Sequence, residues 1–192
     1  HLGFGVVALI GLRLGVIAGV SARPDVLSPV VRPTANVRTC SICDSSLTTE
    51  RSGLLSASNG AWPWNVPPMR TLLDYLRLEE KSRGTKEGCN EGDCGACTVA
   101  LGSLRAGRLV YEPVNACILL MGQIDGKELV TVDDLAEDGT LHPVQQAMVD
   151  LHGSQCGFCT PGFIMSLFAL YHSGKAPTRQ DIVDQIAGNL CR

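Results

Sequence analysis

Hydrophobic and polar positions follow three different patterns along the chain. Residues 1–20 are almost wholly apolar, and residues up to about 50 show no sustained period of either kind. Short strand-like stretches and one helical stretch occupy 51–135, and from 136 onward the apolar positions recur at helical spacing. The pattern predicts an unassigned extension over 1–50, an α+β part over 51–135 and an all-α part over 136–192.

Capping and turn residues give the expected elements of the first structured part. Asn59-Gly60 is typical of a type I′ turn and predicts a hairpin between two short apolar arms. Thr71 should cap a helix running to about Lys81, with Asp74 at the capping-box position. Three strand-like stretches follow, at 98–101, 108–114 and 128–132.

The second part should contain three helices, each opened by a recognisable signal. His142-Pro143 opens a helix ending at Leu151, Thr160-Pro161 opens one ending at Tyr171, and Thr178 caps one reaching Ala187.

The extension over 1–50 carries two weaker signals. Val20-Ser21-Ala22 has the small residues of a signal-peptidase site, so residues 1–22 could be a secretory signal or anchor. No basic region precedes the apolar run, however, which favours an ill-defined or wrongly assigned extension. The polar remainder is typical of a linker and holds Cys40-Ser41-Ile42-Cys43, which could be half a zinc site or a redox pair.

Composition excludes some functions and points to metal. The formal net charge of -3, without a run of Lys or Arg, excludes the electrostatic pattern of nucleic-acid or anionic-lipid binding. Nine cysteines in 192 residues cannot all be paired within a monomer, so metal ligation is the simplest explanation. The chain begins with His1 and stops at Cys191-Arg192, which suggests a fragment of a longer protein.

Three cysteines in one glycine-rich loop carry the strongest signal. Cys89, Cys94 and Cys97 have the C-x4-C-x2-C spacing that plant-type ferredoxins use for a 2Fe-2S cluster, and Cys117 is the candidate fourth ligand. Glycines between them allow backbone N–H groups to approach the sulfurs. Structural zinc and disulfides are the alternatives, and both fit the spacing and the composition less well.

A second set of cysteines lies in the helical part. Cys156 and Cys159 form a C-x2-C pair between the first two predicted helices, and Cys191 follows the third. The three thiols could meet at one point, but a 2Fe-2S cluster needs a fourth ligand. We expect no catalytic residues in this chain, because the sequence offers no nucleophile beside a base, and His142, His152 and His172 suit surface or capping positions.

Four motifs together resemble the iron-sulfur portion of the xanthine dehydrogenase family of molybdenum hydroxylases. They are residues 71–77, 84–99, 141–146 and 155–162. The residues around Cys97, Cys117 and Cys159 are more similar to a bacterial xanthine dehydrogenase small subunit than to an aldehyde or carbon monoxide dehydrogenase. The resemblance implies a β-grasp ferredoxin domain holding one 2Fe-2S cluster, then a helical bundle holding a second. The family ends the second set with Cys-Arg-Cys, so one ligand would follow Arg192, and Gln155 matches a position near molybdopterin.

The resemblance also implies a function and partners. The chain would pass electrons from a molybdenum subunit through both clusters to FAD and NAD during hypoxanthine or xanthine oxidation, as part of a cytoplasmic hetero-oligomer. A periplasmic location would follow if residues 1–22 were a true signal. Alternatives are the small subunit of an aldehyde, carbon monoxide or N-heterocycle dehydrogenase, and a stand-alone ferredoxin-like carrier. Phe158, Phe163, Met165 and Phe168 could form a docking face of a resident relay, or internal core.

Overall fold

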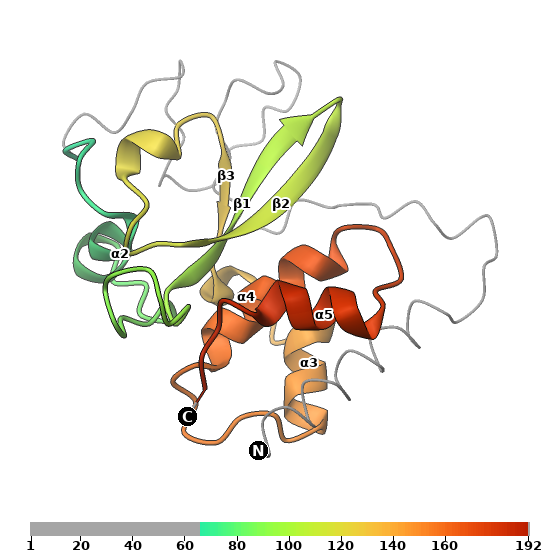
Figure 1. The fold of residues 1–192 in the computed structure, drawn as a ribbon. Helices are drawn as coiled ribbons and strands as arrows, with labels where there is room; N and C mark the ends of the chain where they lie inside the picture. Colours follow the sequence, from blue (N-terminus) through green and yellow to red (C-terminus); the bar gives the residue numbers. More distant parts are fainter. Residues whose placement is uncertain (1–65, 192) are drawn as a thin grey trace.

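The computed structural model describes residues 66–191, as a small antiparallel sheet with helices against it (Figure 1). The predictions for residues 1–50, including Cys40 and Cys43, and for the hairpin at Asn59-Gly60 lie outside the described residues. Within them, helical and strand elements both occur, which confirms a mixed α+β fold.

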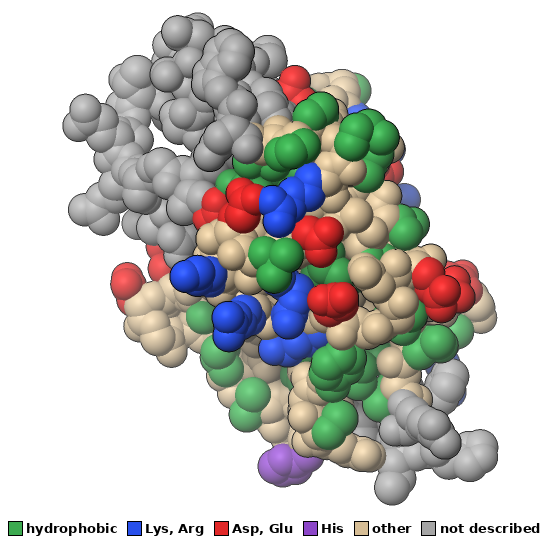
Figure 2. Space-filling model, turned by 90° about the vertical axis from the view of Figure 1, so that its left-hand side faces the viewer, with side chains coloured by type: hydrophobic (Ala, Val, Ile, Leu, Met, Phe, Trp, Pro, Cys, Tyr) green, Lys and Arg blue, Asp and Glu red, His purple; other side chains and the backbone are tan. Residues whose placement is uncertain are grey.

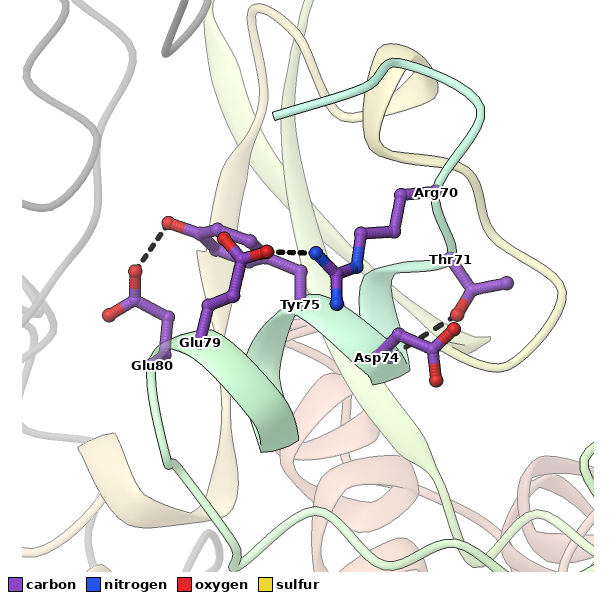
Figure 3. A network of polar contacts seen from close by, with 6 residues as sticks. All are labelled: Arg70, Thr71, Asp74, Tyr75, Glu79 and Glu80. Atoms are coloured by element: carbon purple, nitrogen blue, oxygen red, sulfur yellow. Dashed lines mark hydrogen bonds and ion pairs between the residues drawn. The ribbon is translucent and has the colours of Figure 1, made fainter. Parts of the chain in front are cut away.

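The first helical segment is the one that Thr71 was expected to cap. The Thr71 hydroxyl accepts a hydrogen bond of 3.2 Å from the N–H of Asp74. The segment comprises α2 (Leu72–Asp74) and then η1 (Tyr75–Glu79), which has π-helical hydrogen bonds. Its polar side carries the pairs Arg70–Glu79 and Tyr75–Glu80 (Figure 3). Its apolar side chains, Leu72, Leu73 and Leu76, are completely buried and anchor the segment to the sheet.

Three antiparallel strands form a sheet in the order β2-β1-β3. β1 (Thr98–Arg105) pairs along its whole length with β2 (Arg108–Asn115), and β3 (Glu128–Val130) pairs with the other edge of β1. The two residues of the β1–β2 turn both have positive φ, +50° and +73°, as a type I′ turn requires. All three predicted strands are therefore present. β1 continues beyond residue 101, whereas β3 ends at 130 and residues 132–134 form a 3-10 turn.

The helices have nearly the predicted bounds. They are α3 (Pro143–Asp150), α4 (Thr160–Tyr171) and α5 (Arg179–Ile186). Thr178 caps α5, and the ring Nδ1 of His142 caps α3 by accepting the N–H of Val144 at 3.3 Å. α4 lies against β1 and β2, and α3 and α5 pack on α4 (Figure 1).

Two clusters of buried side chains hold these layers together. One lies between the sheet and α2 with η1. The other includes α4 residues such as Ile164 and Leu167 together with Ala100 of β1 and Val130 of β3, so the helices and the sheet share a core. Among the described residues, no helix combines the length and apolar character needed to cross a bilayer.

Three of the four residues suggested for a docking face are internal core residues instead. Phe163, Met165 and Phe168 are at most 9% exposed and belong to the core between helices and sheet, because α4 is covered on one side by strands and on the others by helices. Phe158 alone is exposed, at 47%. On the face shown in Figure 2, Lys and Arg side chains are interspersed with Asp and Glu, so that face has mixed charge.

Candidate iron-sulfur sites

The loop before β1 folds around the sulfur atoms of Cys89 and Cys94. The N–H of Cys89 donates to Cys94 Sγ at 3.4 Å, and the N–H of Cys94 donates to Cys89 Sγ at the same distance. The N–H of Ala96 also donates to Cys94 Sγ, at 3.5 Å. Gly88 is required here, because a Cβ on it would lie only 2.7 Å from Cys94 Sγ.

This amide-rich setting suits negatively charged sulfur. The pKa of Cys89 falls to about 7, chiefly because the backbone N–H groups of Glu91 and then Cys94 stabilise the thiolate. Asn90 and Gly92 adopt positive φ, +61° and +91°, which turns the loop so that these amides face inward. A thiolate is the form of cysteine that binds iron, so the loop fits its predicted role.

The hairpin brings the third and fourth cysteines together. Cys97 directly precedes β1 and Cys117 follows β2, and the pairing of Thr98 with Asn115 places them side by side. Both are buried, at 2% and 4% exposure. The pKa of Cys97 rises to about 12, first because burial disfavours the thiolate and then because Cys117 and Cys94 lie close by. Cys94 therefore lies near both Cys89 and the pair formed by Cys97 and Cys117.

The second set also comes together, at the start of α4. Cys159 is the N-cap residue of α4, and its thiol lies close to that of Cys191. Burial, followed by this contact and the nearby Cys156, raises the pKa of Cys159 to about 11. Cys156 and Cys191 are exposed. Gln155 lies exposed in the same loop, one residue before Cys156.

The two sets are direct neighbours. The N–H of Leu190 donates to the carbonyl oxygen of Cys94 at 3.0 Å, so the residue before Cys191 touches a residue of the first set. Gly162 of α4 lies against the Gly95 carbonyl so closely that a Cβ on Gly162 would overlap its oxygen. The contacting residues are far apart in the chain, so the sequence does not show which residues join the two sets.

Two groups of residues were also missed, one beside the cysteines and one at the opposite end of α4. Thr98 and Asn189 bind the Gly95 carbonyl, with Thr98 Oγ1 donating at 2.7 Å and Asn189 Nδ2 at 3.0 Å. His142 and His172 do occupy helix caps as expected, but their rings also pack with one another and with Phe168. No sequence signal marks either group, because the burial of Asn189 and the packing of the rings both depend on tertiary contacts.

The donor set fits a polynuclear iron-sulfur cluster. Thiols come together in two groups. In the first group, backbone N–H donors would stabilise the negative charge on sulfide and thiolate. Within residues 66–191, no three or more His, Cys, Asp or Glu side chains are grouped so that they could hold a single metal ion.

Comparison with known families finds a separate match for each of the two cysteine sets. A 2Fe-2S iron-sulfur cluster binding domain matches residues 64–121, and a second family described as a 2Fe-2S binding domain matches residues 131–192. The first match contains Cys89 and Cys117, and the second contains Cys156 and Cys191.

Similar proteins are longer enzymes. The chain is 46% identical over 131 residues to a xanthine dehydrogenase of Blastobotrys adeninivorans and 41% identical over 131 residues to the human aldehyde oxidase. These alignments cover 67% of this chain but only 9% and 10% of the relatives, so the chain spans about a tenth of their length.

Solved structures show the same relationship. The aldehyde oxidoreductase of Desulfovibrio gigas has a TM-score of 0.57 and 37% identity, over 66% of this chain and 13% of that chain. The quinoline 2-oxidoreductase structure from Pseudomonas putida 86 has a TM-score of 0.58 and 33% identity, over 66% of this chain and 74% of that chain. With two 2Fe-2S domain matches and relatives of this kind, the chain belongs to the molybdenum hydroxylase family of xanthine dehydrogenases and aldehyde oxidases, as its iron-sulfur part.

Proposed function

We propose that this chain carries single electrons from a molybdenum centre through two 2Fe-2S clusters toward FAD and NAD during oxidation of a purine such as hypoxanthine or xanthine. The observation that carries the proposal is the convergence of two thiol sets joined by the hydrogen bond from Leu190 to Cys94. Iron-sulfur clusters supply reversible one-electron chemistry at potentials that the protein adjusts.

The residues of this chain would divide the work as follows. Cys89, Cys94, Cys97 and Cys117 hold the first cluster in a β-grasp ferredoxin domain over 51–135. Cys156, Cys159 and Cys191 hold the second in a helical bundle over 136–192, and one further cysteine completes the set.

Loop amides and burial then tune the two sites differently. In the first site, N–H groups that donate to Cys89 and Cys94 stabilise negative charge on sulfur, and the burial of Cys97 and Cys117 excludes water. In the second, Cys156 and Cys191 are exposed, so a partner surface would have to cover them. Gln155 lies exposed beside Cys156 and is proposed to contact the molybdopterin on that partner.

The partners follow from the same assignment. A molybdenum-binding subunit and an FAD-binding domain or subunit would assemble with this chain in a cytoplasmic hetero-oligomer. An aldehyde or N-heterocycle substrate would be distinguished from a purine by turnover assays on the assembled enzyme, because substrate specificity lies outside these residues. A stand-alone carrier would instead purify as a monomer that reduces several unrelated partners.

Cysteine substitutions combined with spectroscopy test the proposal. The reduced full-length protein, which includes the expected cysteine after Arg192, should contain two distinct 2Fe-2S electron paramagnetic resonance signals. Cys89→Ser and Cys156→Ser should each lose one signal, a different one in each variant, together with about half of the iron. Iron-free protein, zinc in place of iron, or loss of the same signal in both variants would refute it.

A further inference from the structure

Asn189 joins three segments that each lead to a predicted cluster ligand. Its Nδ2 donates to the Gly95 carbonyl at 3.0 Å and to Thr98 Oγ1 at 3.2 Å, within the segment that bears Cys94 and Cys97. Its Oδ1 accepts the hydroxyl of Ser166 at 2.6 Å. Ser166 belongs to α4, the helix that begins after Cys159, and Asn189 itself lies two residues before Cys191.

These contacts lie in the interior. Asn189, Thr98 and Ser166 are 9%, 5% and 3% exposed. Both the nitrogen and the oxygen of the Asn189 side chain have hydrogen-bond partners. An aspartate would lack both donors and a leucine would lack all three hydrogen bonds, and either would leave buried polar atoms without partners.

The surrounding backbone leaves no room for a different arrangement. The Gly95 carbonyl also accepts the N–H and hydroxyl of Thr98, at 3.2 and 2.7 Å. Gly162 permits α4 to approach it, and a Cβ on Gly95 would overlap the Gly188 carbonyl. The hydrogen bond from Leu190 to Cys94 follows directly in the chain. Asn189 thus lies at the junction of the two cysteine sets, where close glycine contacts and a backbone hydrogen bond also join the segments.

We propose that Asn189 is a positioning residue that fixes the separation and orientation of the two cluster sites without binding iron itself. The proposal rests on the proposed function, because it assigns to Asn189 the alignment of the two redox centres. Electron transfer weakens steeply as centres move apart, so a fixed separation is what a two-cluster relay requires.

The test compares three variants of the full-length protein with both clusters loaded. Asn189→Leu removes all three hydrogen bonds at similar size, and Ser166→Ala removes only the bond to Oδ1. Ile182→Val is the matched control, since it weakens the core under α5 without touching Asn189. One readout is the magnetic splitting between the two reduced clusters, which depends on their separation and orientation. The other is hydrogen exchange at the Leu190 amide, which does not depend on iron.

Asn189→Leu should keep both signals, lose or change their mutual splitting, and speed exchange at Leu190 by about tenfold or more, the factor that corresponds to about 1.4 kcal/mol. Ser166→Ala should change both readouts in the same direction but less, and Ile182→Val should leave both unchanged.

Wild-type splitting and wild-type Leu190 exchange in Asn189→Leu would overturn the proposal, as would equal changes in Ile182→Val. If Asn189→Leu fails to fold, the same readouts in Ser166→Ala decide. A wild-type protein without two 2Fe-2S signals would instead refute the proposed function, while Leu190 exchange would still decide whether Asn189 holds the segments together.

Discussion

Replacing Gly162 by alanine tests how closely the two cysteine-bearing parts are packed. Gly162 lies in the first turn of α4, where alanine is a better helix former than glycine by up to about 1 kcal/mol. Helix propensity alone therefore predicts a more stable protein. The structure predicts the opposite, because the added Cβ would overlap the Gly95 carbonyl oxygen and lie 3.0 Å from Asn189 Nδ2.

The size of the effect follows from those contacts. The overlapping atom is a backbone oxygen and the next is a buried, hydrogen-bonded amide nitrogen, so a rotamer change cannot relieve the overlap and α4 must move away from the segment that bears Gly95. Overpacking of this kind costs about 1–3 kcal/mol, which outweighs the gain in propensity. We expect a net loss of about 1–2 kcal/mol, or roughly 2–4 °C in the unfolding midpoint for each kcal/mol in a chain of this size.

Gly188 supplies the matched control. It is a near neighbour of the same junction, but a Cβ on it would have no atom of residues 66–191 within 4 Å, and its φ is not positive. Gly188→Ala should change stability by no more than about 0.5 kcal/mol. Chemical denaturation of both variants beside the wild type, at equal iron content, makes the measurement. A Gly162→Ala protein as stable as the wild type, or more stable, would refute the close packing.

Two further changes should alter stability in defined ways. The pKa of His142 falls from 6.5 to about 4, first because the ring is buried and then because His172 is near, so the unfolded chain takes up protons first and stability should fall as pH drops from about 6.5 to 4. For this half-buried ring we expect the free energy of unfolding to fall by about 1–2 kcal/mol over that range. His142→Asn keeps a capping oxygen but has no titrating ring, so its denaturation midpoint should depend less on pH than that of the wild type. An unchanged pH dependence would show that His142 is not the group responsible. Asp133 accepts hydrogen bonds from the Ser82 hydroxyl at 2.6 Å and the Gly84 N–H at 3.1 Å. Asp133→Ala should therefore lower the free energy of unfolding by about 1 kcal/mol and speed proteolysis within residues 82–88. Equal cleavage rates in the variant and the wild type would show that these bonds do not order the segment.

The helices could be predicted from sequence because their signals are local. Caps at Thr71, His142 and Thr178 and the proline after Thr160 mark where each helix begins, and each of them holds in the structure. The π-helical hydrogen bonds of η1 have no such signal. β1 was expected to end at 101 because glycine and serine follow, but pairing with β2 continues it to Arg105, as tertiary contacts often override strand propensity.

The candidate sites divide in the same way. The cysteine sets could be predicted, because spacing within a loop is visible in a sequence. The role of Asn189 could not, because its partner Gly95 is 94 positions away and the sequence does not show that this asparagine is buried. The contact of His142 with His172 likewise depends on how α3 and α4 pack.

The β1–β2 hairpin links an exposed turn to two buried cysteines that are proposed cluster ligands. Its register runs without a break from the pair Arg105–Arg108 beside the turn to the pair Thr98–Asn115 beside Cys97 and Cys117. Sliding one strand by a single residue would reverse which side of the sheet each side chain faces and would carry a thiol away from its partners. The length of a solvent-exposed loop at the far tip thereby determines whether four sulfurs can meet, so insertions there should be tolerated only when they bulge outward and leave the ladder intact.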